Sequence, residues 1–356
     1  MSNRIIGFIL LMLSFSGGWL WMDYQQALTM PVIVNPVLIE IEKGDSFHQI
    51  TEKLLAQKLA IKPIWFKVIA FTKNASTKIK TGEYELTSGL SIPEILDVFV
   101  LGKTKKYSIT FPEGWSFKEI RQEIDRSPNL QHTLSGLSQE AVWHEMSKDK
   151  NDAGNILDDN VIGPEIPKVI PPDNRQLPEG LFFPDTYFYE KHTSDMSLLK
   201  RAFDKMQQIL RQEWLNRAEG LPVKTPYEAL ILASIVEKET GEKSERPQIA
   251  GVFERRLQQG MMLQTDPTII YGMGDSYQGD IKTKDLTTAT PYNTYMNFGL
   301  PPTPIAMPGR DAIHAVLHPV DGNSLYFVAK GDGTHVFSAT LQEHNAAVDK
   351  FQRKKK

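Results

Sequence analysis

The sequence predicts an α+β protein with an N-terminal transmembrane helix, a small α+β subdomain and a larger α+β domain. Three observations predict this fold class. An uncharged run extends from Ile5 to Met22. Residues 37–105 alternate short strand-like and helical patterns, and residues 106–356 combine further strand-like segments with amphipathic and buried helices. At 356 residues, the chain has room for one membrane segment and two folded units.

The composition is that of a globular protein, with 41% hydrophobic and 23% charged residues. A net charge of -3 provides no broad cationic surface, so nucleic acid is not an expected partner. The chain contains no cysteine, which excludes disulfides, thiolate nucleophiles and thiolate zinc sites.

The run from Ile5 to Met22 is about long enough to cross a bilayer as a helix. Trp19 and Trp21 stand where an interfacial aromatic belt is expected. Arg4 precedes the run, so the positive-inside rule places residues 1–4 in the cytoplasm and the rest of the chain outside it.

Two other interpretations of this segment remain. A cleaved signal peptide would have a shorter apolar region that ends in a small-x-small site, and residues 19–24 offer none. A buried helix of a soluble protein is disfavoured by the extreme N-terminal position and the charged flank. We therefore predict an uncleaved, single-pass anchor over residues 5–22, followed by a spacer over residues 23–36.

Residues 37–105 predict the order strand, helix, helix, strand. Residues 37–41 alternate like a strand, and Asp45 or Ser46 caps a helix after the turn at Gly44. A second helix runs from Lys62-Pro63 to residue 71, and residues 82–86 form a returning strand. This order resembles the LysM-like module, which binds amino-sugar polymers, although a generic α+β packing domain explains it equally well. Ser91 and Glu94 form a capping box for a further helix that ends near residue 102.

The larger domain begins at residue 106 with a strand over residues 107–111, followed by a helix after Ser116. Residues 134–178 contain a polar stretch and five prolines between residues 163 and 178, which predicts an insertion or mobile loop. Folded sequence resumes at residue 179, and an amphipathic helix follows over about residues 196–217.

A buried helix carries the candidate chemistry. Thr225 and Glu228 form a capping box around Pro226, and the helix EALILASIVEKETG is expected to end at Gly241. Its residues 230–236 are apolar or small on every face, so we expect burial.

Two glutamates stand in the last turn of this helix. Glu237 and Glu239 lie about 200° apart around the axis, so only one is expected to act on a substrate. Glu239 continues the bulky apolar stripe of Leu232, Ile235 and Val236. An apolar surrounding and a helix C-terminus both raise a carboxyl pKa, which favours Glu239 as a general acid. The alternative is that both glutamates are solvated charges on a fraying turn.

Several long segments resemble a known family, the endolytic murein transglycosylases, also called YceG-like. They are ILASIVEKET around Glu239, QTDPTIIYGMG at 264–274, TPYNTY at 290–295, GLPPTPIAMPG at 299–309, FPEGW at 111–115, EGLFFPDTY at 179–187, HP at 318–319, YFVAKGDGTHVFS at 326–338 and HN at 344–345. The resemblance extends from the anchor to the C-terminus. The chain departs from the family in a longer proline-rich stretch between about 140 and 178.

The resemblance implies a single-pass protein of the bacterial inner membrane with a LysM-like subdomain and a periplasmic catalytic domain over residues 106–356. It implies a polysaccharide lyase that cleaves the MurNAc-GlcNAc bond within nascent peptidoglycan strands and leaves 1,6-anhydro-MurNAc ends. Such an enzyme would act as a terminase of glycan polymerisation beside peptidoglycan synthases. The family's catalytic glutamate, the second in EKET, falls on Glu239.

We expect sugar-binding side chains in two polar segments that follow the helix. The candidates are Gln264, Asp266, Tyr292, Asn293 and Tyr295. An Asx turn before Pro267 explains Asp266 equally well, and packing in the core explains the two tyrosines. Glu179 and Asp185 either shape the cleft or belong to a structural turn.

Metal and serine chemistry find no support in the motifs. His318, His335 and His344 lack HExxH or comparable spacing, and the chain has no G-x-S-x-G elbow. We therefore expect no metal and no cofactor. Two rival functions remain: a membrane-tethered, non-enzymatic peptidoglycan-binding scaffold, and a hydrolytic muramidase.

Overall fold

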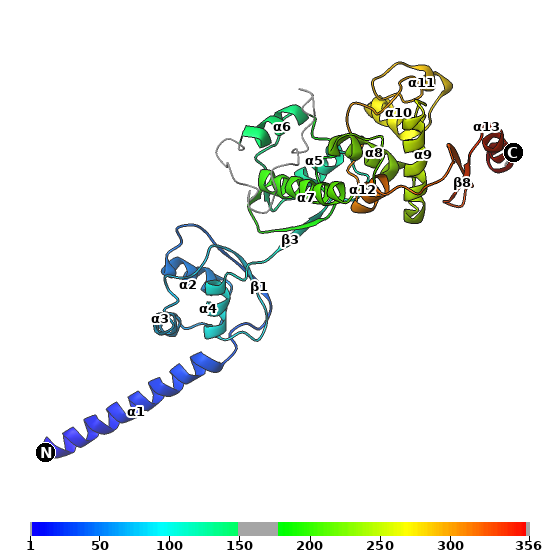
Figure 1. The fold of residues 1–356 in the computed structure, drawn as a ribbon. Coiled ribbons are helices and arrows are strands. Elements are labelled where there is room, and N and C mark those ends of the chain that lie inside the picture. Colours follow the sequence, from blue (N-terminus) through cyan, green and yellow to red (C-terminus); the bar gives the residue numbers. More distant parts are fainter. Residues whose placement is uncertain (1, 149–176, 354–356) are drawn as a thin grey trace. The chain divides into compact units, whose positions relative to one another are not determined.

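A computed structural model describes residues 2–148 and 177–353, which form two compact units (Figure 1). Unit 1 comprises residues 1–107 and 188–193, and unit 2 comprises residues 108–187 and 194–356. Both units contain helices and strands, which confirms the α+β prediction at this level.

The elements up to the end of the first pass through unit 1 are α1 (Ser2–Thr29), β1 (Val37–Ile41), α2 (Phe47–Ala56), α3 (Pro63–Thr72), β2 (Gly82–Leu86) and α4 (Ile92–Leu101). The remaining elements are β3 (Tyr107–Thr110), α5 (Phe117–Asp125), β4 (Leu130–Gln131), α6 (Gln139–Lys148), β5 (Thr186–Tyr189), β6 (Thr193–Ser194), α7 (Asp195–Leu215), α8 (Pro226–Glu239), η1 (Lys243–Glu245), α9 (Arg246–Gln258), α10 (Asp266–Met273), η2 (Gly274–Ser276), α11 (Thr283–Thr287), α12 (Arg310–Leu317), β7 (Tyr326–Ala329), β8 (His335–Ser338), α13 (Leu341–Val348) and η3 (Asp349–Arg353).

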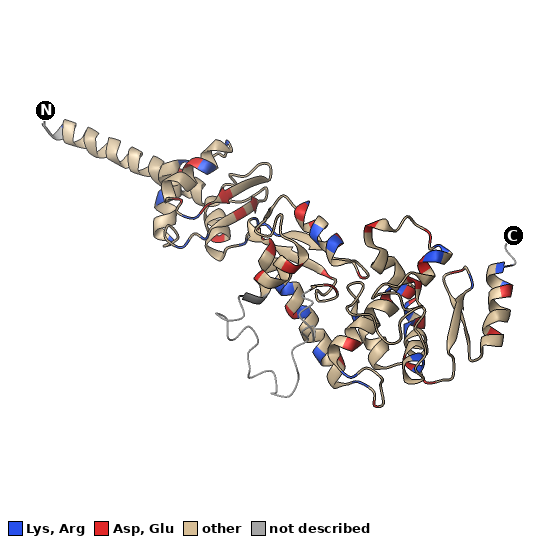
Figure 2. Ribbon diagram, turned by 90° about the horizontal axis from the view of Figure 1, so that it is seen from above, with Lys and Arg blue, Asp and Glu red and all other residues tan. Residues whose placement is uncertain are grey.

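Helix α1 contains the predicted anchor. Over the described residues, the segment Arg4–Thr29 is the one helix that is long and apolar enough to cross a membrane. Between Arg4 and Asp23 the helix contains no charged residue, and Figure 2 shows this apolar length of α1 in tan. Trp19 and Met22 remain 64% and 62% exposed, so the protein itself does not cover this apolar surface.

The predicted spacer differs from the structure. Residues 23–29 continue α1, and Tyr24, Ala27 and Leu28 pack against the core of unit 1. The helix continues because the first helix-breaking residue is Pro31, and because this last stretch has a folded surface to pack on. The apolar helix therefore continues into the core of unit 1 as packed helix rather than through a loose spacer.

Unit 1 has the predicted order of strand, helix, helix and strand in β1, α2, α3 and β2. The two strands pair antiparallel, from Val37 opposite Leu86 to Ile41 opposite Gly82. Of the two predicted caps, Asp45 and Ser46, it is Ser46 that caps α2, and it forms a capping box with Gln49. The fully buried core includes Phe66 and Phe99.

The predicted insertion over residues 134–178 begins too early. Residues 139–148 form α6, and Val142 and Trp143 are buried. The apolar side chains Val142, Trp143 and Met146 share one face at helical spacing, and burial of this face stabilises α6. Residues 149–176 of the predicted insertion lie outside the described residues.

Helix α8 is central to unit 2, where α7, α9, α10 and α12 pack around it (Figure 1). Thr225 caps it, and Pro226 occupies its first turn, as predicted. Leu230, Leu232 and Ile235 are fully buried, and each buried side chain of this size stabilises the packing by about 1.5–3 kcal/mol. The position of the C-terminal end of α8 is therefore fixed by the core.

The C-cap of α8 differs from the prediction by one residue. The helix ends at Glu239, and Thr240 rather than Gly241 is the C-cap, with an extended backbone. The Thr240 side chain is buried, and its hydroxyl accepts a hydrogen bond of 3.0 Å from the backbone N–H of Glu242. This local bond ends the helix without a left-handed glycine.

Candidate active site

Glu239 is the last residue of α8 and lies at the border between core and solvent. Burial of its carboxyl group raises the pKa to about 7. The hydroxyl of Thr265 donates a short hydrogen bond to Oε1 and opposes this rise, whereas the negative charge of Asp266 adds to it. Positive charge on His335 and Arg256 also opposes the rise. A carboxyl group with this pKa exists in both protonation states near neutral pH.

Glu237 has a different environment. Its Oε1 accepts a hydrogen bond of 2.6 Å from Arg246 Nη2, and its Oε2 accepts one of 2.9 Å from the backbone N–H of Gly309. The side chains of Glu237 and Arg246 are only 5% and 4% exposed. Burial raises the pKa of Glu237, and the Gly309 N–H and the Arg246 charge oppose it. Oε1 of Glu237 is thus held in a buried ion pair with Arg246, and Oε2 is bonded to the backbone of Gly309.

Thr265 connects Glu239 to the polar segment at residues 290–295. Its backbone N–H donates to Thr294 Oγ1 at 3.0 Å, and the neighbouring N–H of Gln264 donates to the Thr294 carbonyl at 3.1 Å. Gln264 has a φ of 51°, a left-handed conformation that costs a non-glycine residue about 1 kcal/mol or more. The two bonds to Thr294 hold this strained turn beside the carboxyl group of Glu239.

Three of the predicted sugar-binding residues lie at this surface. Gln264 and Asp266 are exposed, and Tyr295 is half-buried. The Tyr295 hydroxyl donates to Asp266 Oδ1 at 2.7 Å, so Asp266 has a tertiary partner. Gln264 and Asp266 stand on either side of Thr265, which binds Glu239. Tyr295 is linked to the same segment by its bond to Asp266.

The other two predicted residues have structural contacts. Asn293 is 1% exposed, and its side-chain amide donates to backbone carbonyls of the α11 segment, including that of Thr288 at 2.7 Å. The Tyr292 hydroxyl lies 2.7 Å from Thr303 Oγ1, and its ring packs edge-on against Tyr271. These contacts match the core-packing alternative and give both residues a role in fixing the loop.

Two side chains near Glu239 were not linked to it by the sequence: Arg256 was not considered, and His335 was weighed only as a candidate for metal or triad chemistry. Arg256 on α9 donates to the Leu263 carbonyl at 2.7 Å and so fixes the chain just before Gln264. His335 on β8 uses Nδ1 and its backbone N–H to bond both oxygens of Glu245, at 2.7 and 2.9 Å. His335 lies 96 residues after Glu239, so sequence spacing alone gave no signal that the two side chains are close.

The motifs at residues 111–115 and 179–187 support the same region. Lys238 Nζ donates to the Gly114 carbonyl at 3.2 Å, which joins the first motif to the last turn of α8. Glu179 is 2% exposed and accepts hydrogen bonds from the Phe117 N–H at 2.9 Å and the Tyr271 hydroxyl at 3.1 Å. Burial raises the pKa of Glu179 to about 7. These contacts support the structural interpretation of Glu179.

Asp185, the other acidic residue of the second motif, pairs with Lys205 and accepts a bond of 2.7 Å from the backbone N–H of Thr186. Its partners hold the pKa of this carboxyl group below its usual value against the opposing effect of burial. Asp185 therefore also belongs to a structural turn.

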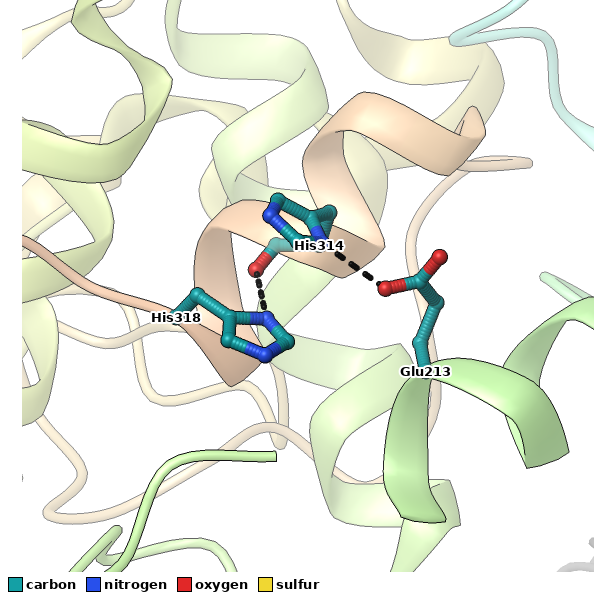
Figure 3. Close-up of side chains that lie close together, drawn as sticks. All are labelled: Glu213, His314 and His318. Atoms are coloured by element: carbon teal, nitrogen blue, oxygen red, sulfur yellow. Dashed lines mark hydrogen bonds and ion pairs between the residues drawn. The ribbon is translucent and has the colours of Figure 1, made fainter. Parts of the chain in front are cut away.

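A separate titratable cluster joins α7 to α12 (Figure 3). Glu213, His314 and His318 offer ligand atoms that lie within 4.8 Å of one another. However, the Glu213 carboxylate already bonds Arg310 Nε and His314 Nδ1, each at 2.8 Å, and these partners hold its pKa below the usual value despite burial. His318 Nε2 lies 2.7 Å from the Asn216 carbonyl. The positive charge of Arg310 opposes a cation here, so we interpret the cluster as an ion-pair network.

The chain is similar to a known family and to named relatives. A model of the YceG-like family matches residues 39–350. The endolytic murein transglycosylase of Bacillus subtilis (strain 168) is 30% identical over 336 residues, which cover 92% of this chain and 89% of that protein.

A relative of the same name from Streptococcus pneumoniae serotype 2 (strain D39 / NCTC 7466) is 29% identical over 364 residues. The match covers 95% of this chain but only 63% of that longer protein. The 2.6 Å crystal structure of a yceG-like protein from Listeria monocytogenes aligns with a TM-score of 0.54 and 27% identity, over 88% of this chain and 98% of that one.

Proposed function

Because the chain belongs to the YceG-like family, we propose that it is an endolytic murein transglycosylase with Glu239 as its catalytic acid and base. The observation that carries this proposal is the environment of Glu239, where burial raises the carboxyl pKa to about 7 at the end of a rigid, buried helix. A single group that must first donate and later accept a proton works best with a pKa near the working pH.

In the first step, protonated Glu239 donates its proton to the glycosidic oxygen between MurNAc and GlcNAc. The C1–O bond breaks, GlcNAc leaves with the new hydroxyl group, and an oxocarbenium-like state develops at C1 of MurNAc. The Thr265 hydroxyl occupies Oε1 of Glu239, so Oε2 is the oxygen that carries the donated proton.

In the second step, the Glu239 carboxylate accepts the proton of the C6 hydroxyl group of the same MurNAc, and O6 bonds to C1. The product ends in 1,6-anhydro-MurNAc, and Glu239 is again protonated. No water is consumed, and no second carboxylate is required. The exposed carboxylate of Asp266 stabilises positive charge near C1, and Gln264 and Tyr295 orient the sugars through hydrogen bonds and ring contact.

The proposed location is the inner membrane. Helix α1 crosses it once, with residues 1–4 in the cytoplasm and both units in the periplasm. Nascent glycan strands emerge on that side, so cleavage within them would end polymerisation by a neighbouring peptidoglycan synthase. The strand–helix–helix–strand order of unit 1 supports a LysM-like role in holding the glycan.

A hydrolytic muramidase is the second candidate, because Asp266 lies close enough to Glu239 for its charge to raise the Glu239 pKa. In that case Asp266 would activate water, as the second carboxylate of glycosidases does. The two reactions give different products, since hydrolysis adds one water to the new end.

The test uses the full chain in detergent with uncrosslinked glycan strands, and mass spectrometry of the new ends. Anhydro ends support the transglycosylase, and reducing ends heavier by one water support the muramidase. Unchanged strands with a folded protein would support the non-enzymatic scaffold. Endolytic cleavage predicts internal fragments of many lengths from the first turnovers, rather than release of single disaccharides.

A further inference from the structure

Helix α3 is apolar on two opposite faces. Phe66, Ile69 and Ala70 are fully buried in unit 1. On the other side, Ile64 and Phe71 are 65% and 77% exposed, and Val68 between them is 36% exposed.

The exposed residues follow one another at spacings of four and three residues, so they form one continuous stripe along the helix. A helix that covers a core needs only one apolar face. The second stripe therefore indicates a second apolar surrounding.

The start of α3 is bound to α1 at the point where the apolar span ends. Trp65 Nε1 donates to Asp23 Oδ2 at 2.7 Å, and Lys62 pairs with the same carboxylate. The rings of Trp65 and Tyr24 lie 5.3 Å apart. Figure 1 shows α3 beside the C-terminal end of α1, in agreement with these contacts.

The level of α3 relative to a bilayer follows from this attachment. The surface of α1 is exposed and apolar up to Met22, whereas the Asp23 side chain is only 12% exposed. At 1.5 Å per residue, Asp23 and Tyr24 lie within about 3 Å of the end of the span. The headgroup layer of one leaflet is about 5–8 Å thick, so the N-terminal turn of α3 falls inside it.

The charge of α3 also fits a lipid surface. Its sequence, PIWFKVIAFT, contains no acidic residue, and Lys67 lies exposed on the face that carries the stripe. A lysine at this place extends its ammonium group to lipid phosphates while its stem stays on the apolar side. Interfacial helices combine an inserted apolar face with such cations.

We propose that α3 is an interfacial helix that inserts Ile64, Val68 and Phe71 into the leaflet from which α1 emerges. Unit 1 then has two membrane contacts, the span and α3, and it lies against the bilayer with a fixed face. This inference rests on the proposed anchoring by α1, which the experiment tests separately.

The absence of cysteine permits clean single-site labelling of the full chain. We would place an environment-sensitive fluorophore at F71C, at I64C, at L13C within the span and at E52C on α2, where the Glu52 side chain is 62% exposed. The labelled proteins are reconstituted in vesicles of phosphatidylethanolamine and phosphatidylglycerol that carry nitroxide lipids, either at the headgroup or at the chain end.

Labels at residues 64 and 71 are expected to emit at shorter wavelength than the label at residue 52, and to be quenched by headgroup nitroxides. The label at residue 13 is quenched by chain-end nitroxides. If residue 13 is quenched but residues 64 and 71 behave like residue 52, the interfacial helix is refuted and the anchor stands. If residue 13 is not quenched either, both proposals fail.

In the first experiment the fluorophore replaces residues of the stripe. A second measurement leaves all three stripe positions unlabelled and places the fluorophore beside them. A fluorophore at K67C is followed in the presence of F71E, with L55E on α2 as the matched exposed substitution; Leu55 is 37% exposed. Loss of headgroup quenching in the F71E variant, but not in the L55E variant, supports insertion of the stripe. Equal quenching in both variants would overturn it. Phe71 contributes little to the core, so F71E is expected to fold.

Discussion

Glu239→Gln separates catalysis from folding more sharply than any other single change in this chain. Glutamine keeps the size of the side chain and an oxygen that accepts the bond from Thr265, but it can neither donate nor accept the catalytic proton. We expect formation of anhydro ends to fall by at least about 10²-fold, which is the lower range for loss of a positioned general acid.

The same substitution should stabilise unit 2 at alkaline pH. Burial raises the pKa of Glu239 from 4.5 to about 7, so the folded state disfavours the carboxylate that the unfolded chain carries freely. This cost is absent below about pH 4.5 and complete above about pH 7. At about 1.4 kcal/mol per pH unit, the free energy of unfolding rises by up to about 3 kcal/mol in the variant at pH 8.

The assay compares thermal unfolding of full-length wild type and variant in detergent, followed by tryptophan fluorescence at pH 4.5 and pH 8. Taking the difference between the two proteins removes the common contribution of unit 1. The stabilisation corresponds to a rise of several degrees at pH 8 and almost none at pH 4.5. A variant that is active, or that gains no stability at pH 8, would refute the assignment of a buried, neutral acid to Glu239.

Three further substitutions probe the surroundings. Thr265→Val removes a bond that lowers the pKa of Glu239, so the basic limb of the pH profile of kcat/KM moves to higher pH, while Thr265→Ser restores it. Glu237→Gln breaks the buried pair with Arg246 and lowers the free energy of unfolding by about 3–5 kcal/mol. The folded variant, assayed below its melting temperature, is still expected to be active. Glu254 is buried, its Oε1 has no hydrogen-bond partner among the described residues, and burial raises its pKa to about 8; Glu254→Gln therefore raises the melting temperature at pH 9 but not at pH 4.5.

Each of these predictions has a contrary result. An unchanged pH profile in Thr265→Val means that the hydroxyl does not tune Glu239. Loss of activity in folded Glu237→Gln returns that residue to the catalytic candidates. An equal gain for Glu254→Gln at both pH values means that the carboxyl group of Glu254 is not the source of the instability.

The sequence by itself determined the local structure where short-range interactions decide it. The capping residues Ser46, Ser91 and Thr225 start helices where predicted, because each satisfies backbone N–H groups within three residues. The apolar run of α1 and the all-round apolar surface of α8 depend only on composition and period. The same period separated Glu237 from Glu239, since residues two positions apart on a helix lie about 200° apart around its axis.

Tertiary structure decided what these elements meet. The helical pattern could not show that α1 continues through residue 29, because its last turns are held by packing on unit 1. Nor could it show that Asn293 is buried, or that Arg246 pairs with Glu237. The pKa of Glu239 depends on Thr265, 26 residues later, and on His335, 96 residues later. Burial and charge act through space, so a linear pattern can nominate a carboxylate, but only the folded chain sets its proton affinity.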